Sequence, residues 1–295
     1  MKKLVFSGAG VALITPFDEN NKVNYEKLAE IIDSQIENGT DALIVCGTTG
    51  EKSTLLHDEH TEVIRFAMQH TAGRVPVIAG TGSNDTEYTV RLSNEAEKAG
   101  VDGLLMVTPY YNKTSQEGLI RHYAYIAERV STPIILYNVP SRTGMNILPE
   151  TYLELSKMER IVATKEASGN LSQIAQSMAL CGENLNFYSG NDDQIVPIMA
   201  LGGKGVISVL SHVAPRTAHE IAASCLRGDF ATGAKLQLEW LDLCNALFVD
   251  VNPIPVKEAM NRMGMQVGEC RMPLAPMNEA KRAVLYKALQ NHGLI

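Results

Sequence analysis

The sequence of 295 residues predicts an α/β fold, a parallel (β/α)8 TIM barrel with a C-terminal helical appendage. Two observations predict this fold. Short apolar runs alternate with segments whose apolar residues recur at helical spacing, and the alternation continues to about residue 208 without a linker. A doubly wound open sheet is the alternative. We favour the barrel because the alternation neither pauses nor divides into two halves.

The predicted strands are short apolar runs that end at glycine, proline or a polar residue. Such runs are typical of parallel strands that are buried on both faces. The first run ends before Pro16, and the second ends before a turn that holds two threonines. The eight predicted strands cover residues 10–15, 42–45, 77–80, 104–107, 134–138, 161–165, 187–190 and 205–208.

Helices are predicted in the segments between these strands. Leu28, Ile31, Ile32 and Ile36 recur at helical spacing before the stop signal at Asn38. Similar patterns predict helices near residues 58–71, 90–96, 119–130 and 171–178, and a short helix from residue 149.

The end of the chain is also rich in helical patterns, which prolines interrupt. Leucines recur between Leu236 and Leu247, and four prolines follow them. We therefore expect residues 1–215 to form a catalytic barrel. Residues 216–295 are expected to form a helical region that packs on the barrel and does not fold as a separate domain.

Charge and cysteine content exclude several classes of function. The net charge of −7 argues against a nucleic-acid or acidic-membrane partner, because phosphate binding requires a basic face. No apolar run approaches transmembrane length. The cysteines are odd in number and far apart, which predicts neither disulfides nor a zinc site and favours a reducing, cytoplasmic location. They are Cys46, Cys181, Cys225, Cys244 and Cys270.

Three motifs for cofactors or metals are incomplete. Asp85 stands where a dinucleotide fingerprint requires its last glycine, and Lys204 is not followed by the Ser or Thr of a P-loop. His57 and His60 lack the spacing of a zinc protease. We therefore expect no cofactor and no metal.

Lys165 is the first candidate for chemistry. It follows the apolar residues 161–164 at the carboxyl end of a predicted strand, where barrel active sites form. A buried ammonium group is costly unless it has a partner, a path to water or a chemical role. One such role is that of an amine nucleophile that forms a Schiff base with a carbonyl substrate. Taken alone, this stretch allows equally well a lysine that reaches solvent or a neighbouring carboxylate.

Other polar residues follow neighbouring strands. Thr48 and Thr49 lie in a turn bounded by glycines, whose backbone N–H groups are suited to a carboxylate. An ordinary strand-to-helix turn is the alternative.

Tyrosines and one arginine complete this set of strand-end residues. Tyr137 closes the fifth strand, and Tyr110 and Tyr111 follow the fourth. The hydroxyl group of a buried tyrosine often only forms a hydrogen bond to a nearby protein group and has no chemical role. Arg142 lies in a loop, where it is either a surface charge or a bidentate clamp for a substrate carboxylate.

The chain resembles the dihydrodipicolinate synthases, within the wider lyase family that includes N-acetylneuraminate lyase. The resemblance covers essentially the whole length, and its motifs are specific in combination. They are Gly47-Thr48-Thr49-Gly50-Glu51, Pro109-Tyr110-Tyr111-Asn112, Tyr137-Asn138-Val139-Pro140-Ser141-Arg142-Thr143-Gly144, Lys165-Glu166-Ala167, Gly205-Val206-Ile207-Ser208 and Asn252-Pro253-Ile254-Pro255-Val256-Lys257.

The resemblance implies condensation of pyruvate with L-aspartate 4-semialdehyde to 4-hydroxy-tetrahydrodipicolinate, in lysine biosynthesis. It implies that Lys165 forms the Schiff base with pyruvate and that Tyr137 donates and accepts protons. Thr48 and Tyr111 match the partners in proton relay, with Tyr111 reaching across from a neighbouring subunit of an expected homotetramer. A dimer is the alternative assembly.

The resemblance also implies two carboxylate sites. Thr49 matches the position that holds the carboxylate of pyruvate, helped by the backbone at Gly190 and Ile207. Arg142 matches the residue that receives the carboxylate of the semialdehyde. An N-acetylneuraminate lyase or a sugar-acid aldolase with the same lysine is the alternative enzyme, but those relatives lack this arginine. A non-catalytic barrel that binds keto acids is the alternative outside enzymes.

The resemblance further implies weak feedback inhibition by lysine. Lysine-sensitive members bind the amino acid between subunits, and His57, His60, Asn84 and Tyr110 fall at matching positions. Lys52 replaces a small polar residue there, and Tyr88 replaces a glutamate. Both changes disfavour a cationic ligand.

Overall fold

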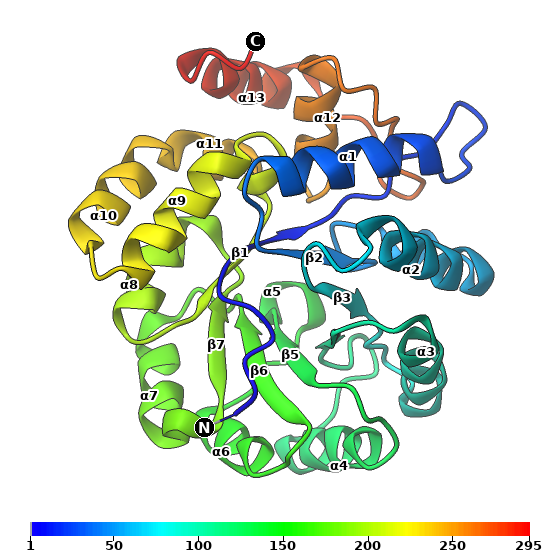
Figure 1. Cartoon of the computed structure of the whole chain (residues 1–295), viewed down its shortest axis with the longest axis vertical. Helices are drawn as coiled ribbons and strands as arrows, with labels where there is room; N and C mark the ends of the chain where they lie inside the picture. The colour runs from blue at the N-terminus through cyan, green and yellow to red at the C-terminus, as the bar shows by residue number, and fades with distance from the viewer. Residues whose placement is uncertain (1) are drawn as a thin grey trace.

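The computed structural model describes residues 2–295, and its eight parallel strands close into a barrel in chain order. Strand β1 pairs with both β2 and β8, so that the sheet has no free edge. Helices surround the strands (Figure 1), and the predicted TIM barrel is confirmed. The strands are β1 (Gly8–Ala12), β2 (Ala42–Val45), β3 (Val77–Gly80), β4 (Gly103–Val107), β5 (Ile134–Asn138), β6 (Ile161–Glu166), β7 (Asn186–Ser189) and β8 (Gly205–Ser208).

Helix α1 (Tyr25–Glu37) shows how the sequence encodes the outer layer. The Asn24 side chain caps the helix by accepting a hydrogen bond from the backbone of Lys27, and the buried face includes Ile31 and Ile32. The other helices between strands are α2 (His57–Thr71), α3 (Thr86–Ala99), α4 (Gln116–Ala127), α5 (Pro140–Thr143), α6 (Pro149–Ser156), α7 (Leu171–Cys181) and α8 (Ile195–Ala200). Two of them, α5 and α8, were not predicted, because each is too short to show helical periodicity.

The first strand begins earlier than the predicted range 10–15. The sheet closes where a Cβ atom on Gly205 would lie 1.9 Å from the carbonyl oxygen of Gly8, so this contact requires glycine. At the other end, β1 stops at Ala12, and Ile14 and Thr15 form hydrogen bonds outside the sheet. The Ile14 N–H donates to His212 Nε2 at 3.0 Å, and the Thr15 hydroxyl donates to the Gly50 carbonyl at 2.7 Å.

The core has two parts, one inside the barrel and one between the barrel and its helices. The inner part is filled by side chains such as Ile44, Ile78 and Ile135. The ring of Tyr188 stacks on Phe6 with centroids 4.4 Å apart, and its hydroxyl donates to the Phe6 carbonyl. The filled interior leaves the carboxyl ends of the strands as the place for a site.

The end of the chain is helical, as predicted. Helix α9 (Pro215–Leu226) packs against β1 and β8. It is followed by α10 (Phe230–Glu239), α11 (Leu241–Ala246), α12 (Ile254–Arg262) and α13 (Glu279–Asn291), and Figure 1 shows α12 and α13 beyond α1. A boundary at residue 215 stays a prediction. Among residues 2–295, no helix combines the length and apolar character that crossing a bilayer requires.

Candidate active site

Lys165 and Tyr137 lie side by side at the carboxyl ends of two paired strands. Lys165 on β6 is in register with Tyr137 on β5. The lysine side chain is 5% exposed, and its Nζ lies 4.4 Å from the centroid of the tyrosine ring. The neutral form of a lysine amine is the one that attacks a carbonyl. The structure therefore brings the predicted nucleophile and the predicted proton carrier together.

Gly190 forms a wall beside the lysine. Its N–H donates to the Glu166 carbonyl at 2.7 Å. A Cβ atom at this position would lie 3.1 Å from Lys165 Cε and 2.7 Å from the Cβ of Ala167, so a side chain would disturb the lysine. Ile207 on β8 is fully buried in the same inner cluster as Tyr137. Both predicted backbone positions thus border the barrel interior.

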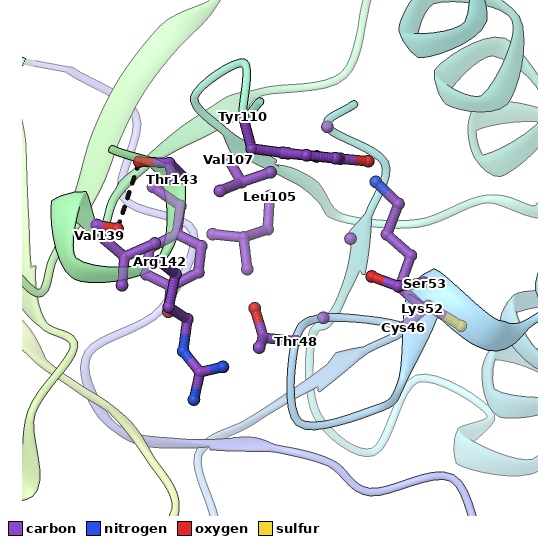
Figure 2. A pocket seen from close by; sticks show the side chains of 14 residues that line it. Cys46, Thr48, Lys52, Ser53, Leu105, Val107, Tyr110, Val139, Arg142 and Thr143 are labelled. Carbon is purple, nitrogen blue, oxygen red and sulfur yellow. Dashed lines mark hydrogen bonds between the residues drawn. The ribbon is translucent and has the colours of Figure 1, made fainter. Parts of the chain in front are cut away.

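A pocket of about 230 Å³ opens above these strand ends. Thr48, Tyr137 and Arg142 all line it, and Figure 2 shows Thr48 between Arg142 and the opposite wall. Tyr137 is 7% exposed and contacts both the pocket and Lys165. This position suits a group that passes protons between the lysine and a ligand in the pocket.

The two threonines occupy a turn with unusual backbone angles. Cys46 and Glu51, on either side of the threonines, have φ values of 54° and 53°, in the left-handed region that non-glycine residues rarely adopt. Thr48 is half-buried at the pocket, whereas Thr49 is 3% exposed and outside the pocket lining. The Thr49 hydroxyl accepts a hydrogen bond from Asn252 Nδ2 at 2.9 Å. The two threonines therefore lie in different environments, Thr48 at the pocket and Thr49 buried outside its lining.

Asn252 is a site residue to which the sequence assigned no role. Its carbonyl accepts a hydrogen bond from Arg142 Nη2 at 3.2 Å, while its side chain binds Thr49. Asn252 is 5% exposed, although it lies more than 100 residues from both partners. The only sequence signal was its place at the start of the Asn-Pro-Ile-Pro motif. It connects the two predicted carboxylate-binding groups.

A buried ion pair stabilises the end of the threonine turn. Glu51 Oε1 lies 2.5 Å from Lys257 Nζ, with side chains that are 1% and 2% exposed. Glu51 Oε2 also accepts a hydrogen bond from the backbone N–H of Arg271 at 2.8 Å. Burial lowers the pKa of Lys257, and the charge of Glu51 opposes that shift. The C-terminal region therefore fixes the backbone of the turn.

Glu166 directly follows Lys165 in β6, but its side chain contacts the surrounding helices. Its carboxylate accepts hydrogen bonds from the Tyr152 hydroxyl at 2.7 Å and the Ser168 N–H at 3.0 Å. Burial raises the pKa of this carboxyl group. Because successive residues of a strand face opposite sides, Glu166 anchors α6 while Lys165 reaches the barrel interior.

Within the single chain, Tyr111 lies apart from the other candidate site residues. Its side chain is 92% exposed, its φ is 70°, and it does not line the pocket. Tyr110 lines the pocket instead. A large exposed aromatic ring on a strained backbone is typical of a binding surface.

His57 and His60 each lie close to an oxygen atom of another residue. Within residues 2–295, no three His, Cys, Asp or Glu side chains are arranged to hold a metal. His60 Nε2 lies 3.0 Å from the Gly80 carbonyl, and His57 Nε2 lies 3.0 Å from a carboxylate oxygen of Glu95.

Comparisons with known proteins agree over nearly the whole chain. A model of the Dihydrodipicolinate synthetase family matches residues 5–292. The chain is 57% identical to the 4-hydroxy-tetrahydrodipicolinate synthase of Lachnoclostridium phytofermentans over 99% of each protein. It is 56% identical to the protein of the same name from Caldicellulosiruptor bescii over 98% of each.

Solved structures give the same result. The dihydrodipicolinate synthase of Aquifex aeolicus has a TM-score of 0.95 and 45% identity, covering 98% of this chain and 99% of that one. The dihydrodipicolinate synthase of Acinetobacter baumannii, complexed with pyruvate, has a TM-score of 0.96 and 39% identity over the same shares. With a family match across the barrel, its helical appendage and every motif of the site, the chain belongs to the dihydrodipicolinate synthetase family.

Proposed function

We propose that this protein condenses pyruvate with L-aspartate 4-semialdehyde to give 4-hydroxy-tetrahydrodipicolinate. The observation that carries the proposal is the buried Lys165 amine against the ring of Tyr137, beside a pocket that Arg142 lines. The names of the relatives support this enzyme over N-acetylneuraminate lyase. No cofactor is required, because the Schiff base itself withdraws electrons from the carbon that reacts.

The proposed reaction begins when the neutral Lys165 amine attacks the keto carbon of pyruvate. The resulting carbinolamine loses water to become an iminium ion, and loss of a methyl proton gives an enamine. The enamine carbon then attacks the aldehyde of the second substrate, whose oxygen takes up a proton. The substrate amine finally displaces Lys165 from the iminium carbon and closes the ring, which frees the enzyme.

Tyr137 is proposed to carry these protons, since it contacts both Lys165 and the pocket. Thr48 and a neighbour's Tyr111 are proposed to connect its hydroxyl to solvent. Thr49, with the backbone at Gly190 and Ile207, is proposed to bind the carboxylate of pyruvate.

Mixing the purified protein with both substrates tests the function. The expected product is a cyclic dicarboxylate that appears only when pyruvate and the semialdehyde are both present, detected by mass spectrometry. Better cleavage of N-acetylneuraminate than condensation would reject the proposal.

Arg142→Ala is expected to weaken use of the semialdehyde while leaving Schiff-base formation with pyruvate intact. A hydrogen bond to a charged group contributes about 1.5–3 kcal/mol, so kcat/KM for the semialdehyde should fall about 10- to 150-fold. Steady-state kinetics with each substrate varied in turn measures this loss. Arg142→Lys is the matched variant, which keeps the charge but loses the planar fork. Normal semialdehyde kinetics in Arg142→Ala would contradict the assignment.

Tyr111 is proposed to act in a neighbouring subunit of a homotetramer, consistent with its 92% exposed side chain. Inactive Tyr111→Phe and Lys165→Ala proteins should therefore regain some activity when they are mixed and reassembled. Mixed assemblies contain sites with an intact lysine from one subunit and an intact tyrosine from the other. Confirmed subunit exchange without recovery would place Tyr111 in its own subunit's site. A cytoplasmic location also stays a prediction.

Free lysine is expected to inhibit the enzyme weakly or not at all. Tyr88 has no carboxylate, and its hydroxyl lies 3.3 Å from His57 Nδ1. The carboxylate of the nearby Glu87 already accepts a hydrogen bond from the Tyr125 hydroxyl, so it is not free to bind the ligand. Lys52 adds a like charge, and contact between like charges at about 4 Å costs roughly 1 kcal/mol in water and about 4 kcal/mol at an effective dielectric of 20. A lysine titration of the initial rate measures the effect. Strong inhibition would show that these charges do not control binding.

A further inference from the structure

The register between β5 and β6 shifts by one residue near the start of the two strands, between Ile134 and Ile135. Continued without the shift, the register would place Tyr137 beside Thr164, whose hydroxyl lies 3.1 Å from a tyrosine hydroxyl in the helix layer. A one-residue change of register exchanges the two faces of a strand. The shift is therefore what brings Lys165 beside Tyr137 in the barrel interior.

The next residues of both strands form a second pair directly behind the first. Asn138 and Glu166 are in register, and both are fully buried. Asn138 Nδ2 donates to the Glu166 carboxylate, with distances of 3.1 Å and 3.3 Å to its two oxygens. Because successive residues of a strand face opposite sides, these side chains point to the helix layer. We call Asn138 and Glu166 the strand clamp.

Both members of the strand clamp are also held by other segments. The Glu166 carboxylate accepts hydrogen bonds from the Tyr152 hydroxyl on α6 at 2.7 Å and from the Ser168 N–H at 3.0 Å. Asn138 Oδ1 accepts from the Ile147 N–H at 3.1 Å. Buried polar groups whose partners are all present fix one arrangement of their segments. The strand clamp is therefore built to hold the ends of β5 and β6 in the shifted register.

We propose that Glu166 is a positioning residue for the reaction, a role that rests on the proposed function and deepens it. Through Asn138 and Tyr152 it holds the end of β6 against β5, so that the Lys165 amine stays beside Tyr137. Loss of its carboxylate would leave two buried donors unpaired, and the strand ends would move as those donors find other partners. A displacement of about 1 Å at reacting groups can lower a rate about 100-fold.

Timed trapping of the Schiff base tests this role in the full-length protein. Each variant is mixed with saturating pyruvate for increasing times and quenched into borohydride, and peptide mass spectrometry measures the adduct at Lys165. Glu166→Ala should lower the rate constant of adduct formation about tenfold or more, while the final adduct per folded protein reaches the wild-type level. A purely structural role would lower the folded fraction, and with it the final adduct, but not the rate constant. A wild-type rate constant in Glu166→Ala would overturn the proposal.

Glu166→Gln is the matched variant, because a glutamine keeps the hydrogen bonds without the charge. Its oxygen can accept from Asn138 Nδ2, whose other hydrogen is bonded to Asn146 Oδ1 at 2.8 Å. Its Nε2 can donate to the Tyr152 hydroxyl, which then turns to Thr164 Oγ1 at 3.1 Å. Glu166→Gln should therefore restore a rate constant close to that of the wild type. A Glu166→Gln protein as slow as Glu166→Ala would overturn positioning and assign the effect to the charge.

Two further variants control for a general loss of stability. Ile31→Ala removes a buried side chain of α1, so it should lower the thermal stability and leave the rate constant unchanged. Tyr152→Phe keeps the Glu166 carboxylate but removes one of its donors, so its rate constant should fall by a smaller factor than that of Glu166→Ala. Tyr152→Phe also decides the question if Glu166→Ala does not fold. An equal fall in Ile31→Ala, or no fall in Tyr152→Phe, would overturn the proposal.

The same samples separate this inference from the proposed function. A normal adduct at Lys165 whose rate constant does not depend on Glu166 rejects the positioning role alone. A rate constant that depends on Glu166, without a cyclic product when the semialdehyde is added, rejects the condensation alone. Absence of an adduct at Lys165 in the wild type would overturn both.

Discussion

Pyruvate and borohydride together are expected to inactivate the protein irreversibly and to modify Lys165 alone. Reduction converts the Schiff base to a stable secondary amine, which adds the mass of pyruvic acid less one oxygen. Lys165 is favoured because it is 5% exposed and its Nζ lies over the ring of Tyr137 at the end of a barrel strand. Peptide mass spectrometry locates the adduct, and residual activity gives the inactivated fraction.

Lys165→Ala supplies the control for this experiment. It should show no adduct and no condensation, whereas Lys235→Met should behave as the wild type. Borohydride without pyruvate should leave activity intact, because reduction requires the imine. An adduct at Lys52 or Lys257, or an unmodified Lys165 in inactivated protein, would refute the assigned nucleophile.

Breaking the buried pair of Glu51 and Lys257 is expected to cause the largest loss of stability. Removing one member leaves an unpaired charge in a place with 1–2% exposure, which typically costs about 3–5 kcal/mol. Glu51→Gln and Lys257→Met should therefore each lower the free energy of unfolding by about this amount. Urea unfolding measures the change if the slope with denaturant stays constant.

The double variant measures the interaction between Glu51 and Lys257 separately from their contacts with other groups. Glu51→Gln with Lys257→Met removes both charges, so its loss should be smaller than the sum of the single losses by about 0.5–3 kcal/mol. Glu117 and Arg121 form the matched exposed pair on α4, with side chains that are 66% and 79% exposed. Arg121→Ala should cost only about 0.3–0.5 kcal/mol. Similar losses from both pairs would mean that burial of Glu51 and Lys257 does not determine their effect.

The same variants link stability to the site. Glu51 directly follows the threonine turn, and its carboxylate binds both Lys257 and the backbone of Arg271. Loss of that anchor should also reduce the affinity for pyruvate in the protein that remains folded. The C-terminal region thus contributes to the site although none of its residues lines the pocket.

Residues whose signal is local could be predicted from the sequence alone. Each strand is a short apolar run, so the eight-strand barrel followed from the pattern, with β1 displaced by two residues at its start. Lys165 was recognisable because a lysine directly after a buried strand is unusual. Tyr137, Thr48 and Arg142 were candidates because each lies at or just after the carboxyl end of a strand, and these ends meet at one face of a barrel. The family resemblance assigned their roles.

Contacts between distant segments were decided only by the tertiary structure. Asn252 lies 203 residues from Thr49 and 110 from Arg142, yet it binds both. Hydrophobic periodicity records which face of a segment is buried, not which distant partner covers it.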